Sequence, residues 1–325
     1  MLARALAPAK VTLFGEHAVV YGYPALVMSI DLFTEVIVDH PLKDAVIIES
    51  EFPGGRITAE LGLNGGGETA LPYVSTSVKK VWALMGSALP VRIGIKSHIP
   101  FGSGLGSSAS VAVGTLAAYS AAYGKLLGIA DLAALGREVE VSVQGRASPM
   151  DTLAVSVGGV LEVNASFEGG FSSIGRLDGP RFLLAYTKKE METGAAVEFV
   201  RRRREQMGRR FDDLMEAIGS LADEAVRAIR KGDWVSLGSL MSENEAYLEQ
   251  LGVVNERSRA LIRTALEHGA LGAKISGGGF GGSVVVLCGE KMDALSNSLK
   301  EVAESVYSVR GAGGVSVSRP GDQPA

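Results

Sequence analysis

Glycine gathers in short clusters, and these constrain the fold more than any other feature of the sequence. The chain has 42 glycines in 325 residues, well above the usual share of about 7%. They follow no three-residue period, which excludes a collagen-like chain. One cluster falls in 102–106 and another in 277–282. Such glycine-rich segments are unfavourable for folding unless the backbone must turn sharply or approach another group closely. We therefore expect the chemistry of this chain to lie at the clusters.

The composition is that of an ordinary globular protein and excludes several functional classes. Hydrophobic residues make up 46% of the chain, and the formal net charge is −4, so there is no basic footprint for nucleic acid. The single cysteine, Cys288, excludes a disulfide framework and a cysteine-based zinc site. The N-terminus lacks a signal-peptide pattern, and the most apolar stretch, 109–122, is shorter than the ~20 residues of a membrane span. We expect a cytoplasmic protein with no membrane partner.

The hydrophobic pattern predicts a strand-rich first half and a helix-rich second half. Strands are expected at 11–14, 25–29, 33–39, 45–50, 56–61, 91–97, 182–187, 273–276, 283–287 and 314–319. Helices are expected at 71–85, 107–123, 131–143, 195–207, 212–231, 234–251, 256–268 and 292–307, with Asp131 as the N-cap of the third. The change of pattern near Gly179-Pro180 predicts two domains, 1–179 and 180–325.

The segment 100–110, PFGSGLGSSAS, follows a predicted strand and opens an apolar helix. Three glycines in five positions let backbone N–H groups turn toward one point, and the helix adds its positive N-terminal end. The segment therefore favours a phosphate site, in which a hydroxyl of Ser107 or Ser108 could reach Mg²⁺. A plain tight turn is the alternative.

Two other phosphate-binding patterns fit this loop poorly. The dinucleotide fingerprint needs an acid about 20 residues further on, and the first acid after the loop is Asp131. A Walker A loop needs a lysine directly after its glycines, and none follows here.

Two more segments suggest a ligand site. Lys10 precedes a short apolar strand, and Glu16 and His17 follow it, so the three could surround a small polar ligand. Surface charges beside a turn are the alternative. The segment 274–285, KISGGGFGGSVV, has five glycines in six residues between two strands, as expected where backbone closely approaches a ligand.

In their order along the chain, these three segments resemble the motifs of the GHMP kinases, the small-molecule kinases named for galactose, homoserine, mevalonate and phosphomevalonate. The pattern Pro-x-x-x-Gly-Leu-Gly-Ser-Ser-Ala is that family's phosphate loop. The segment 7–22 is similar to the mevalonate kinase branch, as are Asn244, the turn 251–253 and 269–274. The resemblance extends over about 6–317, nearly the whole chain.

The resemblance implies an α+β, two-domain GHMP kinase fold. Its N-terminal domain would be S5-like and its C-terminal domain ferredoxin-like and rich in helices, with the active site between them. It implies ATP- and Mg²⁺-dependent phosphorylation of mevalonate to 5-phosphomevalonate, a step of isoprenoid biosynthesis, and a homodimer. A sister kinase acting on phosphomevalonate would need more basic residues near the acceptor. A non-catalytic metabolite sensor would not need the catalytic carboxylate and lysine that the family has, which match Asp151 and Lys10.

The resemblance also assigns roles to individual residues. Asp151 matches the catalytic carboxylate, supported by Lys10, whose charge would keep it ionised. Glu140, eleven residues earlier, and Ser108 match the Mg²⁺ ligands, although Glu138 is close enough to be confused with Glu140. The substrate-binding positions are Glu16 and His17. The ATP-binding positions are Pro100, Phe101, Gly102, Ser103, Gly104, Leu105, Gly106, Ser107, Ser108, Ala109 and Ser110.

Two points at these positions are open on the sequence alone. Asp151 could instead cap a helix that begins at Thr152. The residues before it are Ala147-Ser148-Pro149, where the family usually has Pro-Ser-Gly, and proline lacks both an N–H and glycine's freedom at positive φ.

The basic run 201–204 is either a solvated helix face or a contact for an anionic group.

Overall fold

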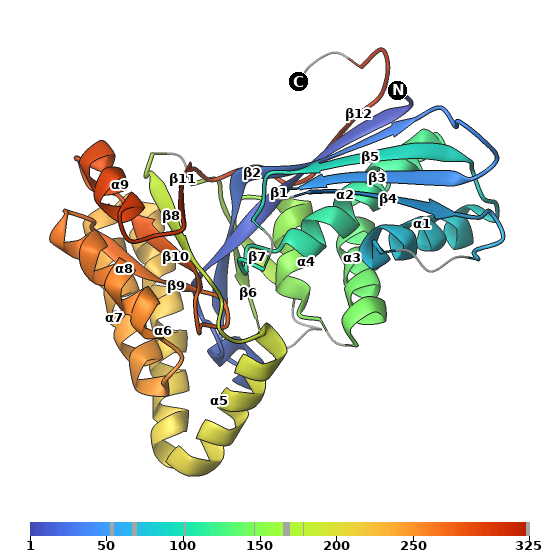
Figure 1. The fold of residues 1–325 in the computed structure, drawn as a ribbon. Helices are drawn as coiled ribbons and strands as arrows, with labels where there is room; N and C mark the ends of the chain where they lie inside the picture. Colours follow the sequence, from blue (N-terminus) through green and yellow to red (C-terminus); the bar gives the residue numbers. More distant parts are fainter. Residues whose placement is uncertain are drawn as a thin grey trace.

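A computed structural model describes residues 1–52, 55–66, 70–100, 102–145, 147–164, 170–177 and 179–322. The chain builds two sheets, each with its own set of helices, and the two sheets meet along β1 and β2 (Figure 1). Within the described ranges, no helix is long and apolar enough to cross a membrane.

The first sheet has the order β12-β1-β2-β5-β3-β4, with β6 paired to β2 and β7 paired to β6. Its strands are antiparallel except for the parallel pair β3 and β5. They are β1 (Ala3–Phe14), β2 (Ala25–Asp39), β3 (Val46–Phe52), β4 (Gly55–Leu61), β5 (Val91–Ser97), β6 (Val160–Val163), β7 (Phe171–Gly175) and β12 (Ser316–Ser318). One face is covered by α1 (Pro72–Met85), α2 (Ser107–Ala122), α3 (Ile129–Gln144) and α4 (Pro149–Val157) (Figure 1).

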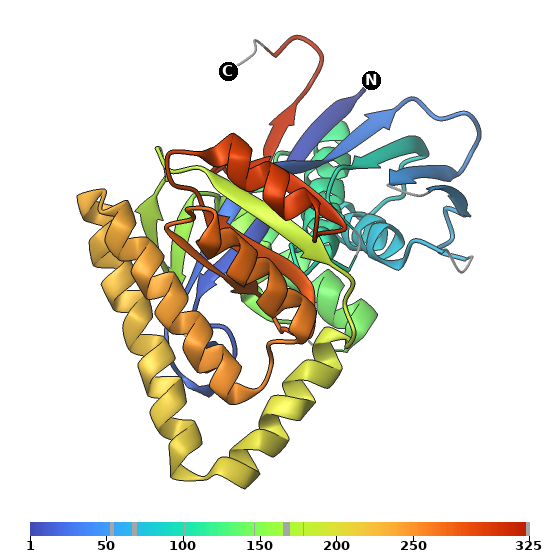
Figure 2. The ribbon, with the colours of Figure 1, turned by 60° about the vertical axis from the view of Figure 1, so that its left-hand side comes forward.

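The second sheet is antiparallel, with the order β11-β8-β10-β9. Its strands are β8 (Phe182–Thr187), β9 (Gly272–Ser276), β10 (Gly282–Leu287) and β11 (Ser305–Val309). The helices of this half are α5 (Thr193–Met207), α6 (Arg209–Lys231), α7 (Trp234–Leu251), α8 (Glu256–Glu267) and α9 (Met292–Lys300). Helices α5 and α6 form a V whose tip points away from the sheets (Figure 2).

Helix α2 is the central element of the first half. From Ala109 to Ala121 every residue except Val111 is buried, because α1, α3 and β1 surround the helix. This environment explains the apolar stretch at 109–122, which lacks the polar face of a surface helix. The buried helix presents its N-terminus to the site described below.

Several boundaries differ from the sequence prediction. The predicted helix 292–307 is wrong beyond Lys300, because 305–309 forms the edge strand β11 from alternating β-formers. Asp131 is not an N-cap, since Gly128 precedes the first helical residue and Asp131 lies in the first turn. The two strands predicted at 25–29 and 33–39 are one strand, β2. Helix α4 was offered only as an alternative that begins at Thr152, and it begins three residues earlier, at Pro149. The chain changes from the first sheet to the second between β7 and β8, while a domain boundary at 179/180 stays a prediction.

Tyr119 joins α2 to the elements around it and provides a test of this packing. Its hydroxyl accepts from Trp82 Nε1 at 2.6 Å and donates to the Leu89 carbonyl at 2.6 Å. Tyr119→Phe leaves both groups without this partner, so we expect urea denaturation to show a loss of about 1–3 kcal/mol of unfolding free energy. Tyr123→Phe removes a comparable but exposed bond, to the Ser87 carbonyl, and should cost less. Equal losses in the two variants would contradict this description.

Candidate active site

The loop before α2 has the backbone geometry of an anion site. Gly102, Gly104 and Gly106 have φ values of 71°, 78° and 73°, in the left-handed region that favours glycine. Gly106 is the N-cap of α2, and the first N–H groups of a helix have no partner within it. A phosphate oxygen can therefore be bound by these groups and by the positive end of the helix. Of the predicted ATP-binding positions, Phe101 lies outside the described residues.

The second glycine cluster packs against this loop. The Ser283 hydroxyl donates to the Ser103 carbonyl at 3.0 Å, and a Cβ on Gly282 would lie 3.3 Å from the same oxygen. Ser276 also bridges the two halves, since its hydroxyl accepts from Thr12 N at 2.9 Å. The glycines at 277–282 therefore let this part of the backbone lie close to the phosphate loop.

Lys10 and Asp151 form an ion pair beside the loop. The Lys10 backbone N–H donates to the Leu105 carbonyl at 2.9 Å, which fixes β1 against the loop. Its Nζ lies 3.1 Å from Asp151 Oδ1, with the lysine side chain 5% exposed and the aspartate 28% exposed. A Cβ on Gly106 would lie 2.9 Å from Lys10 Cγ, so the lysine stem runs directly past the N-cap of α2.

The start of α4 resolves the two questions left open around Asp151. The N-cap is Ser148, whose hydroxyl accepts from Met150 N, so Asp151 is the third helical residue and does not cap the helix. Pro149 occupies the first helical position, where its fixed φ suits the helix and its missing N–H would have no partner within the helix. The departure from the family pattern is therefore accommodated by a helix that leaves Asp151 facing Lys10.

Ser108 and Glu140 form a second polar pair at the same place. The Ser108 hydroxyl donates to Glu140 Oε1 at 2.7 Å, and Glu140 is only 2% exposed. Burial and the charge of Asp151 raise the pKa of Glu140 to about 7, against the Ser108 hydrogen bond and the charge of Lys10. Glu138 lies on the exposed face of α3 and pairs with Lys80 at 2.6 Å. Of the two acids, it is Glu140 that shares the site with Asp151.

Glu16 and His17 lie at the far end of β1, where the chain enters the short 3₁₀ helix η1 (Ala18–Tyr21). Glu16 is buried and ion-paired with Lys274 of β9, and it also accepts from Asn244 Nδ2 at 3.3 Å. His17 is buried with a φ of 62°, unusual for a residue other than glycine. Burial lowers its pKa to about 4, so the ring is neutral at pH 7.

Two lysines near the site were not predicted as functional residues. Lys274 is fully buried in β9, and its sequence signal was a charge inside an otherwise apolar strand. Lys189 follows β8, where a Cβ on Gly281 would lie 3.0 Å from its Cα. Burial lowers the pKa of Lys189, as does the charge of Lys10, while Glu192 opposes them. The turn around Lys189 carries several charges, so no sequence signal distinguishes it.

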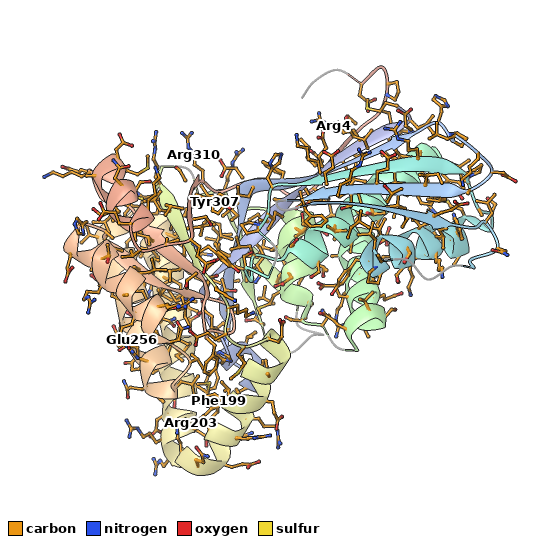
Figure 3. All side chains as sticks on the ribbon, viewed as in Figure 1. Arg4, Phe199, Arg203, Glu256, Tyr307 and Arg310 are labelled. Carbon is orange, nitrogen blue, oxygen red and sulfur yellow. The ribbon has the colours of Figure 1, made fainter. Side chains whose placement is uncertain are left out.

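The arginine run 201–204 lies on α5. Arg201 and Arg202 pair with Glu198 on the same helix, and Arg204 lies 3.8 Å from Asp212 of α6. Arg203, close to Phe199 in Figure 3, donates to the Leu251 carbonyl at 3.2 Å. These contacts account for the run without a ligand.

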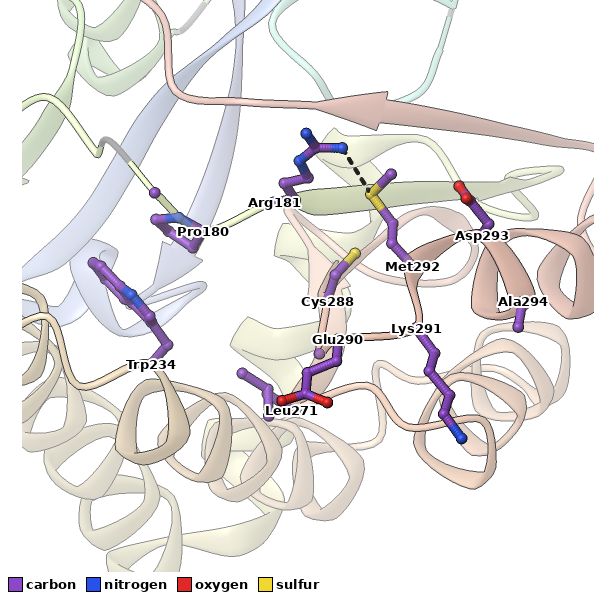
Figure 4. A pocket seen from close by; sticks show the side chains of 12 residues that line it. Pro180, Arg181, Trp234, Leu271, Cys288, Glu290, Lys291, Met292, Asp293 and Ala294 are labelled. Atoms are coloured by element: carbon purple, nitrogen blue, oxygen red, sulfur yellow. Dashed lines mark hydrogen bonds between the residues drawn. The ribbon is translucent and has the colours of Figure 1, made fainter.

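A separate surface cavity of about 500 Å³ lies between the start of α7 and the start of α9 (Figure 4). Arg181 and Met292 contact each other on one side of it, and Trp234 lies on the other. Of the residues predicted for the active site, none that the structure describes lines this cavity.

Comparison with known sequences places the chain in a family. It matches the GHMP kinases N terminal domain over residues 73–159 and the GHMP kinases C terminal domain over residues 225–305. A relative from Thermococcus sibiricus is 34% identical over 311 residues, covering 91% of this chain and 92% of that protein. The chain therefore belongs to the GHMP kinase family.

Two of the similar relatives share one name. The Thermococcus sibiricus protein is a mevalonate kinase, as is a relative from Pyrococcus abyssi, 34% identical over 92% of both chains. The solved mevalonate kinase of Methanococcus jannaschii superimposes with a TM-score of 0.85 at 29% identity, covering 96% of this chain and 99% of that one. These matches confirm the two-domain GHMP kinase fold that the motifs implied.

Gly106→Ala tests the phosphate loop. The added Cβ would lie 2.9 Å from Lys10 Cγ at a φ of 73°, so the loop or the lysine must move. We expect nucleotide affinity, measured by calorimetry, to fall at least about 10-fold while circular dichroism still reports a folded protein.

The matched control is Gly86→Ala, because Gly86 has a φ of 71° but no atom within 4 Å of an added Cβ. This variant should bind nucleotide like the wild type. If both variants kept wild-type affinity, the glycine loop would be a structural turn and not a phosphate site.

Proposed function

We propose that this chain transfers the γ-phosphoryl group of ATP to mevalonate, giving 5-phosphomevalonate and ADP. The observation that carries the proposal is the Lys10–Asp151 ion pair beside the glycine N-cap of α2. An acid, a cation and a phosphate-binding loop are what phosphoryl transfer to an alcohol needs. Mevalonate is proposed as the acceptor because the named relatives are mevalonate kinases, and a similar structure from L. major, 25% identical with a TM-score of 0.82, is described in complex with R-mevalonate.

Asp151 is the proposed catalytic carboxylate. It would orient the acceptor hydroxyl and receive its proton as the oxygen forms a bond to the γ-phosphorus and the bond to the ADP oxygen breaks. A positioned base of this kind contributes roughly 10²–10⁴-fold in rate. Lys10, 3.1 Å away, holds the carboxylate in place and adds positive charge near the transferred group.

The residues present fit a bound Mg²⁺. Ser108 and Glu140 place two oxygen donors together beside the phosphate loop, and Glu140 is a buried carboxylate whose charge a cation would compensate. Mg²⁺ prefers oxygen ligands and usually takes one or two from the protein, the remainder coming from phosphates and water. When bound, it would neutralise charge on the phosphate oxygens.

The homodimer and the cytoplasmic location stay predictions from the sequence. A single mass near twice that of the 33.9-kDa chain in light scattering would support the dimer.

A panel of acceptors tests the function. Purified protein with MgATP should release ADP when mevalonate is added. The kcat/KM values for phosphomevalonate, homoserine and galactose should be at least about 100-fold lower, which corresponds to about 2.7 kcal/mol less transition-state stabilisation. Turnover of phosphomevalonate at a comparable rate would favour the sister kinase. ATP binding without turnover of any of these alcohols would favour a sensor.

Magnesium titration tests the proposed ligands. Glu140→Gln and Ser108→Ala should each shift the Mg²⁺ concentration that gives half-maximal activity upward, by about 10-fold for the carboxylate. The control is Glu138→Gln, since Glu138 is exposed on the same helix. A defect confined to Glu138→Gln, or equal titration curves for all the proteins, would contradict the assignment.

A further inference from the structure

A groove of about 330 Å³ lies between α7 and α8, beside the edge of the second sheet. Strand β9 forms that edge, and both helices pack against it (Figure 1). Glu245 of α7 lines the groove together with Ile262 and Leu266 of α8 and Ala273 of β9. No predicted active-site residue that the structure describes lies along the groove, so it is a second place on the molecule where a ligand could bind.

Glu245 is the nearly buried polar group of this groove, with only 4% of the residue exposed. Its Oε2 accepts from Ile275 N at 2.9 Å and so satisfies an N–H on the free edge of β9. Its Oε1 is also buried and has no hydrogen-bond partner among the described residues. A buried polar atom without a partner is unfavourable, which makes a ligand the natural source of the missing hydrogen bond.

Support of the fold does not explain a carboxyl group at this position. A glutamine could accept the same bond from Ile275 at a lower desolvation cost. Burial raises the pKa of Glu245 to about 7, against the Ile275 hydrogen bond and the charge of Lys274. Because Oε2 already accepts an N–H, a proton on the carboxyl group would sit on Oε1, where it would have no acceptor. Oε1 therefore lacks a partner in both protonation states, and a cationic donor would satisfy the atom and compensate the charge.

The cations of the described chain do not pair with Glu245. Arg259 lines the groove, but it is engaged by Glu249 at 3.0 Å and by Glu256 at 2.5 Å. Lys274 is ion-paired with Glu16. Arg263, exposed on α8, also lines the groove and makes no hydrogen bond or ion pair within the described ranges. Three acids and two arginines line the groove in all, a balance that favours a cationic ligand.

The apolar part of the lining indicates what else the ligand carries. Ile262 is 8% exposed and Ala273 is fully buried, while Leu266 at 41% exposed leaves apolar surface for a ligand to cover. The volume of the groove is at the lower end of the roughly 300–1,000 Å³ of small-molecule sites. It suits a short carbon chain better than a nucleotide.

We propose that this groove binds a small aliphatic amine, whose ammonium group donates to Glu245 Oε1 while its carbon chain lies against Ile262 and Leu266. The ammonium group supplies both the hydrogen bond and the positive charge that the buried carboxyl group lacks. The proposal goes beyond the phosphoryl transfer described above and does not depend on it.

Titration with n-butylammonium chloride at constant ionic strength tests the site. The Ile275 amide reports on it in ¹H–¹⁵N spectra, because this N–H is bonded to Glu245. We expect a saturable shift with a Kd of about 1–10 mM. Glu245→Gln keeps an acceptor for Ile275 but loses the charge, so it should bind at least about 10-fold more weakly. The matched control is Glu243→Gln, the same change at an exposed acid of α7 outside the groove, which should bind like the wild type.

A second series uses only the wild-type protein. Affinity should rise by up to about fourfold per methylene from ethylammonium to butylammonium, since each buried methylene adds to the hydrophobic gain. The uncharged analogue 1-butanol should bind at least about 10-fold more weakly than butylammonium. Affinity that falls with chain length, or equal binding of butanol, would overturn the proposal.

Three results of the titration would also overturn it. These are the absence of a saturable shift up to about 50 mM amine, wild-type affinity in Glu245→Gln, and binding that appears only in Arg263→Ala. The last result would mean that the Arg263 side chain itself turns into the groove and pairs with Glu245.

Discussion

The contacts of Lys10 hold the candidate active site together. Its backbone N–H binds the Leu105 carbonyl, its stem lies against Gly106, and its Nζ meets Asp151. A strand, the phosphate loop and the start of α4 are thereby fixed relative to one another by a single residue. The need for a glycine at position 106 follows from this arrangement, because the space that a Cβ would need is occupied by the lysine.

The second half of the chain completes the site through its glycine cluster. Ser276 and Ser283 tie the strands on either side of 277–282 to Thr12 and Ser103. Behind these contacts, Lys274 extends the connection to Glu16 and the segment that carries His17. The two halves therefore meet through hydrogen bonds and a buried ion pair at the place where the proposed acceptor and nucleotide would lie.

Local patterns predicted the parts of the site whose geometry is local. Glycine spacing and the following helix predicted a phosphate loop before α2. The interval to Asp151, taken from the family resemblance, favoured Glu140 over Glu138, and in the structure Glu140 is the acid that bonds to Ser108. The partner of Glu16 could not be predicted, because Lys274 lies 258 residues away and only the tertiary fold brings them together. The edge strand β11 was missed for a similar reason, since pairing with β8 overrides the helical spacing that precedes it. Helix α4 is short and begins at a proline, so its pattern was too brief to predict its start, and the sequence offered it only as an alternative that begins at Thr152.

The most direct test of this account is the single-turnover rate of phosphoryl transfer in Asp151→Asn, measured with MgATP and mevalonate both saturating. Asp131→Asn is the control, because Asp131 is an exposed acid at the equivalent third position of α3. The account predicts that the rate falls roughly 10²–10⁴-fold in Asp151→Asn while nucleotide affinity stays within about threefold of wild type. A rate within a few-fold of wild type would contradict it, because the carboxylate that faces Lys10 would then not take part in the reaction.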